Sequence, residues 1–113
     1  MHELSIVMGI IKIAEDYAKA ADAQFIDEIE LDIGALSGID MQSMEFAWTQ
    51  AIKGTMLNGT TKKINTILAK AKCLDCEAEF EIKNYFDACP ACGEHLIAIM
   101  QGKELKVKSL LVS

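Results

Sequence analysis

The sequence contains no arginine, because all eleven of its basic residues are lysines, and seventeen acidic residues give it a net charge of −6. Proteins that bind nucleic acid neutralise phosphates with basic side chains and often read guanine with a bidentate arginine. An acidic chain without arginine repels phosphate and lacks such a reader. The composition therefore argues against nucleic-acid binding.

Motifs of several common functional classes are also absent. No apolar run approaches the ~20 residues that a membrane-spanning helix needs. The sequence has no GxxxxGK[ST] loop for nucleoside triphosphate hydrolysis and no GxSxG nucleophile elbow. Only two histidines, His2 and His95, are present. We therefore expect neither a membrane protein nor an enzyme.

The cysteines form two pairs, Cys73–Cys76 and Cys89–Cys92, with twelve residues between the pairs. Two such C-x2-C pairs close a tetrahedral shell of four thiolates around Zn²⁺, with Zn–S distances of about 2.3 Å. Residues that favour turns lie in or beside the pairs: Asp75, Pro90 and Gly93. Because four thiolates leave no open coordination position, we expect the zinc to be structural.

Two disulfides in a secreted domain are the alternative, which we favour less because no signal peptide precedes the chain. A redox C-x2-C is less expected still, since two matched pairs are present. The metal interpretation fits a cytoplasmic protein. His95, three residues after Cys92, is either a surface residue, a substitute zinc ligand or a residue that orients one.

Hydrophobic periodicity predicts helices over about 4–22 and 41–53, the second with Asp40 as its N-cap. The expected strands cover 25–33, 63–71, 79–82, 95–100 and 104–112. In the last strand, one face is expected to carry Leu105, Val107, Ser109 and Leu111. The order predicts an α+β fold in which two helices pack on a small β-sheet that the C-terminal strand completes. A four-cysteine zinc ribbon is inserted as a domain over 72–100, and the other domain consists of 1–71 with 101–113.

The N-terminus offers a second kind of metal site. Met1-His2-Glu3 places an α-amine, a backbone amide nitrogen and an imidazole in consecutive chelate rings. Nitrogen-rich, tetragonal surroundings suit Ni(II) or Cu(II). From position alone, however, a histidine at position 2 is more often part of a frayed terminus.

The whole chain resembles the HypA/HybF family of hydrogenase maturation nickel metallochaperones. The segments that carry this resemblance are Met1-His2-Glu3, Gly34-Ala35-Leu36-Ser37-Gly38, Thr55, both cysteine pairs with Pro90 and Gly93, and Gly102-Lys103-Glu104-Leu105-Lys106-Val107-Lys108-Ser109-Leu110. Their order and spacing across essentially all 113 residues are specific.

The resemblance implies that nickel is a transient cargo bound by Met1 and His2, with Glu3 as a ligand or tuning group and Asp40 as a further contributor. It implies delivery to the precursor of the [NiFe]-hydrogenase large subunit, with the GTPase HypB as partner and, in some organisms, support of urease maturation proteins. We expect a monomer or weak homodimer. The alternative is a zinc-ribbon module that binds proteins or nucleic acid without a nickel function.

Overall fold

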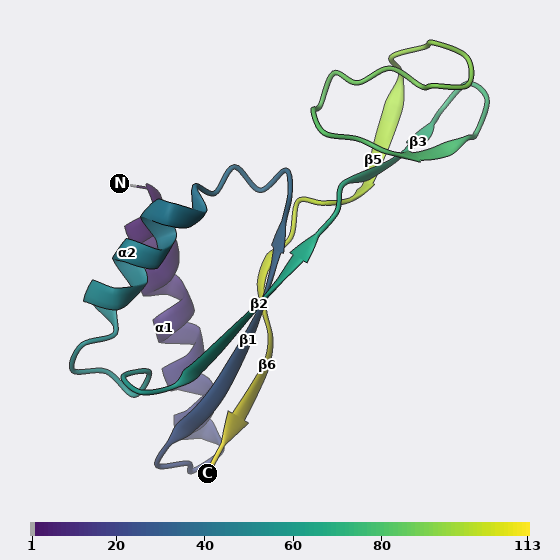
Figure 1. The fold of residues 1–113 in the computed structure, drawn as a ribbon. Coiled ribbons are helices and arrows are strands. Elements are labelled where there is room, and N and C mark those ends of the chain that lie inside the picture. Colours follow the sequence, from purple (N-terminus) through teal and green to yellow (C-terminus); the bar gives the residue numbers. More distant parts are fainter. Residues whose placement is uncertain (1) are drawn as a thin grey trace. The chain divides into compact units, whose positions relative to one another are not determined.

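The computed structural model describes residues 2–113, with the backbone alone for His2 (Figure 1). Its elements are α1 (His2–Ala20), β1 (Ile26–Gly34), α2 (Met41–Ala51), β2 (Thr61–Ile67), β3 (Lys70–Cys73), β4 (Glu79–Glu81), β5 (Ile97–Gln101) and β6 (Leu105–Val112). The strands form two three-stranded sheets, in the orders β2-β1-β6 and β4-β3-β5. The predicted α+β fold class, with two helices, a sheet completed by the C-terminal strand and an inserted ribbon, is confirmed.

The chain divides into two compact units. The first consists of the described residues up to Leu31, with Ile39–Ile64 and Lys106–Ser113. The second consists of Asp32–Gly38 and Asn65–Leu105, and it contains all four cysteines. The functional division at residues 72 and 100 stays a prediction.

In the first unit, α1 and α2 lie side by side over one face of the β2-β1-β6 sheet (Figure 1). The predicted periodicity of α1 is seen in its buried side chains, which include Val7, Ile11, Ala14 and Ala18. They pack in the same core as Met44, Ala47 and Trp48 of α2. Burying one large apolar side chain contributes about 1.5–3 kcal/mol. None of the described helices has both the length and the apolarity to cross a bilayer.

Helix α2 begins where the sequence predicts. Asp40 has the extended backbone of an N-cap residue, and its Oδ1 accepts the N–H groups of Gln42 at 3.0 Å and Ser43 at 3.3 Å. These are two of the N–H groups that have no partner within the helix. The cap contributes roughly 1 kcal/mol.

The predicted alternation of the last strand is wrong. Val107, Leu110 and Val112 are the half-buried apolar residues of β6, whereas Ser109 and Leu111 are exposed. The strict period of two breaks at Lys108 and Ser109, which are neighbours in the strand and yet both contact the Glu30 carboxylate. From Leu110 onward, each side chain therefore faces the opposite side of the sheet from the one that strict alternation predicts.

The strand predicted over 63–71 is two strands that belong to different sheets. β2 ends at Ile67 and β3 begins at Lys70, so Leu68 and Ala69 separate them. Gly102 packs directly on Ala69, where a Cβ on Gly102 would lie 2.6 Å from the Ala69 Cα. Gly102 also has a φ of +115°. This contact comes from a residue far along the chain, so the local pattern of 63–71 could not reveal it.

Gly34 approaches the backbone of Gly102 more closely still, because a Cβ at Gly34 would lie 2.0 Å from the Gly102 carbonyl oxygen. We predict that Gly34→Ala lowers the free energy of unfolding by about 1–3 kcal/mol, since rigid backbone blocks the added methyl. Gly9→Ala is the control, because Gly9 lies in α1 with nothing within 4 Å of the added atom. It should stabilise the protein by roughly 0.5–1 kcal/mol. Urea denaturation of both zinc-loaded variants, followed by far-UV circular dichroism, measures the difference, and equal midpoints would refute the close approach.

Candidate metal centre

The second unit holds the cysteines on a short three-stranded ribbon. β3 is its central strand, and Ala71 pairs with Phe80 of β4 and Ile99 of β5. A small core of Ala69, Ala71 and Ile82 lies beneath these strands. β3 ends at Cys73, so the strand delivers the chain directly into the first cysteine pair.

The two cysteine pairs adopt matching turns. The N–H of Glu77 donates to the carbonyl of Cys73 at 3.0 Å, and the N–H of Gly93 donates to the carbonyl of Cys89 at 2.8 Å. Glu77 and Gly93 each follow the second cysteine of a pair, and they have φ values of +65° and +80°. Both knuckles therefore reverse the chain through a residue in the left-handed backbone conformation. Glycine adopts this conformation easily, whereas glutamate adopts it at a steric cost.

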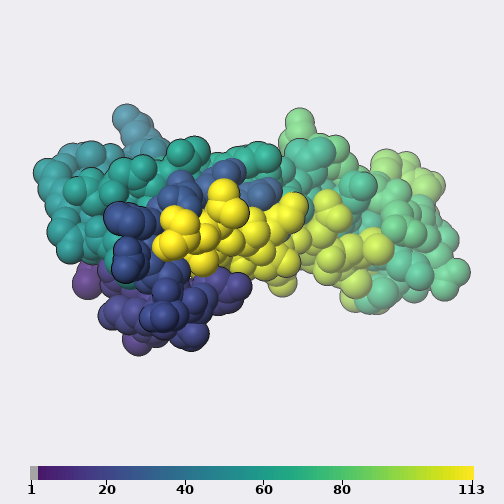
Figure 2. All heavy atoms as spheres, turned by 90° about the horizontal axis from the view of Figure 1, so that it is seen from below, coloured from purple at the N-terminus to yellow at the C-terminus, as the bar shows by residue number. Residues whose placement is uncertain are grey.

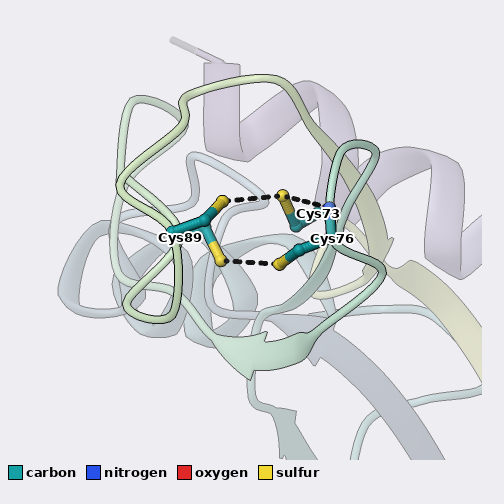
Figure 3. A group of neighbouring side chains, drawn as sticks. Cys73, Cys76 and Cys89 are labelled. Carbon is teal, nitrogen blue, oxygen red and sulfur yellow. Dashed lines mark hydrogen bonds between the residues drawn. The ribbon is translucent and has the colours of Figure 1, made fainter.

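The four sulfurs converge on one point, as Figure 3 shows for the labelled cysteines. The Cys73 and Cys92 Sγ atoms are 3.6 Å apart, and so are those of Cys76 and Cys89. All four lie within 4.8 Å of one another, and all four cysteines are free thiols. A tetrahedron with Zn–S bonds of about 2.3 Å has sulfurs about 3.8 Å apart, so this donor set fits Zn²⁺.

The crowding of the four thiols separates their pKa values. Desolvation raises the pKa of Cys89, but the N–H groups of Cys92 and Ala91 outweigh it and bring the pKa to about 7. The N–H of Glu94 lowers the pKa of Cys92, whereas desolvation and the neighbouring thiols raise it to about 12. A divalent ion would stabilise four thiolates together and release their protons, so its affinity should fall as the pH falls.

Residues that the sequence did not single out shape the loop between the pairs. The Asp87 Oδ2 accepts the N–H groups of Lys83 at 2.7 Å and Asn84 at 3.2 Å, and these bonds lower the pKa of Asp87. The Tyr85 hydroxyl donates to the carbonyl of Leu36 at 3.0 Å. The aspartate thus closes a turn by accepting from residues three and four positions before it. The contact with Leu36 carries no local signal.

The residues predicted to bind nickel lie in the first unit. Met1 lies outside the described residues, and His2 is the first residue of α1, with its side chain outside the description. Glu3 and Asp40 are 37 positions apart in the sequence but adjacent in the structure. The Glu3 Oε2 accepts a hydrogen bond from the Asp40 N–H at 3.4 Å. His95 is exposed, and the metal-binding cluster found among the described residues consists of the four cysteines without it.

Together, the α+β fold and the four-thiol cluster define a small metal-binding protein that carries a ribbon. The family described as "Hydrogenase/urease nickel incorporation, metallochaperone, hypA" matches residues 1–112. The chain belongs to this HypA family of nickel metallochaperones that act in hydrogenase maturation.

Individual relatives agree over the whole length. The hydrogenase maturation factor HypA of Parabacteroides distasonis is 42% identical, covering 99% of this chain and 97% of that protein. That of Azotobacter vinelandii is 38% identical, covering 99% of both. The solution structure of the Ni metallochaperone HypA from Helicobacter pylori is 25% identical, covers 97% of this chain and 96% of that one, and has a TM-score of 0.68.

We predict that Cys92→Ser greatly weakens zinc binding and unfolds the ribbon, because its core is too small to hold the strands without the ion. The described α1–α2 core should persist. Ala91→Ser is the matched control, since it places the same hydroxyl one position away. Zinc content by mass spectrometry and amide signals by NMR measure the two effects. Full zinc occupancy and an intact ribbon in Cys92→Ser would contradict a four-thiolate site.

Proposed function

We propose that this protein binds Ni(II) at its N-terminus and delivers it to the precursor of the [NiFe]-hydrogenase large subunit. Membership of the HypA family across residues 1–112 is the observation that carries this proposal. The proposed nickel donors are the Met1 α-amine, the His2 amide nitrogen and the His2 imidazole. Nitrogen donors of this kind suit tetragonal Ni(II).

The start of α1 supports the use of the His2 amide as a donor. His2 is the first residue of the helix, and the first four N–H groups of a helix have no partner within it. The amide nitrogen therefore does not have to give up a helical hydrogen bond to reach a metal. Because deprotonating an amide requires a strong Lewis acid, nickel would provide the driving force for that step.

Electrostatics support the roles of Glu3 and Asp40. The N-terminus of a helix carries a partial positive charge, which disfavours a bound cation. Glu3 lies in the first turn of α1, and Asp40 caps α2. The hydrogen bond between them places two carboxylate residues together at these helix ends. We propose that their negative charge offsets the helix dipoles and favours nickel.

The second metal is structural in this proposal. Cys73, Cys76, Cys89 and Cys92 hold Zn²⁺, whose chemistry at this site is to crosslink the two knuckles. The four-thiolate shell leaves no position for a substrate. We propose residues 72–100 as the zinc-ribbon domain and 1–71 with 101–113 as the nickel-binding domain.

The partners follow from the same assignment. The sequence has no phosphate-binding loop, so any nucleotide-driven step of delivery would lie on another chain, and the GTPase HypB is the proposed partner for that step. We propose a non-enzymatic, cytoplasmic protein, monomeric or weakly dimeric, that binds neither nucleic acid nor membranes. Urease maturation proteins are a second proposed destination, because the family description names urease beside hydrogenase.

We predict that nickel binding requires a free N-terminus. Extending the chain by two residues converts the α-amine into a peptide nitrogen and removes one donor, so affinity should fall at least roughly tenfold. Because an unperturbed α-amine has a pKa of about 7.7–8.0, affinity of the native chain should also fall as the pH drops below that range. Calorimetric titration with Ni(II) and ligand-field spectra compare the two chains.

His2→Ala in the native-length chain is the companion variant, and it should bind nickel as poorly as the extended chain while retaining zinc. Equal nickel affinity and equal spectra for the native and extended chains would exclude the terminal-amine model.

We predict that Asp40→Asn and Asp40→Ala separate charge from capping. Asparagine caps a helix as well as aspartate does, so only Asp40→Ala should lose roughly 1 kcal/mol of unfolding free energy. Both variants lose the carboxylate charge, so both should bind nickel roughly tenfold more weakly. Thermal unfolding and nickel titration measure the two effects. Unchanged nickel affinity in both would leave Asp40 with its cap role alone.

A further inference from the structure

A groove of about 360 Å³ lies between α1 and β6 in the first unit. Ile13 and Tyr17 line it from the helix, and the four consecutive residues Val107 to Leu110, which include Lys108, line it from the strand. Ile13 and Tyr17 lie one helical turn apart, so their side chains form one apolar surface. This surface is largely uncovered, because Ile13 is 58% exposed and Tyr17 is 57% exposed. Folding of the described unit therefore leaves an apolar strip beside β6 uncovered.

The strand that borders the groove is an edge strand. In the order β2-β1-β6, no described strand pairs with the outer side of β6. Figure 2 shows the yellow residues of β6 uncovered on the face in view. Half of the backbone N–H and C=O groups of such a strand point outward and can pair with another extended chain.

The charges on β6 indicate what kind of chain would pair with it. Lys106 and Lys108 are exposed, flank Val107, and are the only charged residues in the strand. Lys108 also lies 3.5 Å from the Glu30 carboxylate. A second copy of this chain would bring two such lysine pairs together at the shared edge, where like charges oppose pairing. An acidic segment would instead be attracted.

We propose that β6 binds an extended acidic segment of a partner protein by strand addition. Successive side chains of a strand point to opposite faces. Apolar residues at alternate positions of the segment fill the groove under Ile13 and Tyr17, the acidic residues between them meet Lys106, and Lys108 at the wall of the groove adds a second positive charge. Backbone hydrogen bonds supply affinity, while the groove and the lysines supply specificity. This surface is independent of the proposed nickel donors.

A fluorescently labelled peptide that alternates valine with glutamate, as long as β6, is the probe. Fluorescence anisotropy should show binding to the zinc-loaded full chain. Two control peptides separate the contributions. Methylating alternate backbone nitrogens removes the strand hydrogen bonds and should abolish binding, and replacing glutamate by lysine should do the same.

Matched variants locate the site. Ile13→Asn should weaken binding roughly tenfold, whereas Met8→Asn should not, although Met8 is equally exposed on the same helix at 59%. Lys106→Gln should weaken binding, whereas Lys63→Gln on β2, the other edge strand, should not. Circular dichroism and nickel titration should be unchanged in all four variants.

Equal binding of the methylated peptide, or equal affinity of Ile13→Asn and Met8→Asn, would overturn the proposal. So would a homodimer in sedimentation equilibrium that Ile13→Asn dissociates, because the occupant would then be a second copy. The nickel titration is a separate measurement, so failure here would leave the proposed nickel function intact.

Discussion

The close approach of Gly34 to Gly102 is the constraint on which the second unit depends. At this point three segments of chain meet: the end of β1, the link between β2 and β3, and the link between β5 and β6. The N–H of Gly34 donates to the Glu104 carbonyl and that of Leu36 to the Gly102 carbonyl, both at 2.7 Å. The N–H of Ala35 donates to Ile67 at 2.9 Å. Because the segments touch through backbone, only residues without a Cβ fit where they come closest.

This constraint explains which parts of the fold the sequence could predict. The periodicity of α1 and the cap of α2 arise from residues a few positions apart, and the structure confirms the cap and the central part of the periodicity, from Val7 to Ala18. The break at Leu68-Ala69 depends on Gly102, more than thirty positions away, so the alternation of Ile64, Thr66 and Leu68 continues smoothly through it. The irregularity at Lys108 and Ser109 likewise coincides with contacts to Glu30, which is far away in the sequence.

The same distinction applies to the candidate sites. The spacing of the cysteines predicts their cluster, because each knuckle is a local turn and the pairs match. Glu77 shows the limit of that reasoning, since it occupies the position that Gly93 fills in the other knuckle and adopts the same left-handed backbone. Its role follows only from comparing the two turns. The contact between Glu3 and Asp40 joins separate helices, and no local pattern contains it.

The two proposed metal sites differ in where their donors lie along the chain, and this difference suits the roles proposed for them. The four thiols come from two knuckles that backbone hydrogen bonds hold in place: Leu74, in the first knuckle, donates to the carbonyl of Leu96 just before β5, and Cys89, in the second, donates to the carbonyl of Glu94. Removing an ion from that shell would require the knuckles to separate. The proposed nickel donors instead all belong to two consecutive residues, Met1 and His2. In that proposal an acceptor or a proton would displace these nitrogen donors one at a time, whereas zinc would leave only after all four thiolates had let go of it.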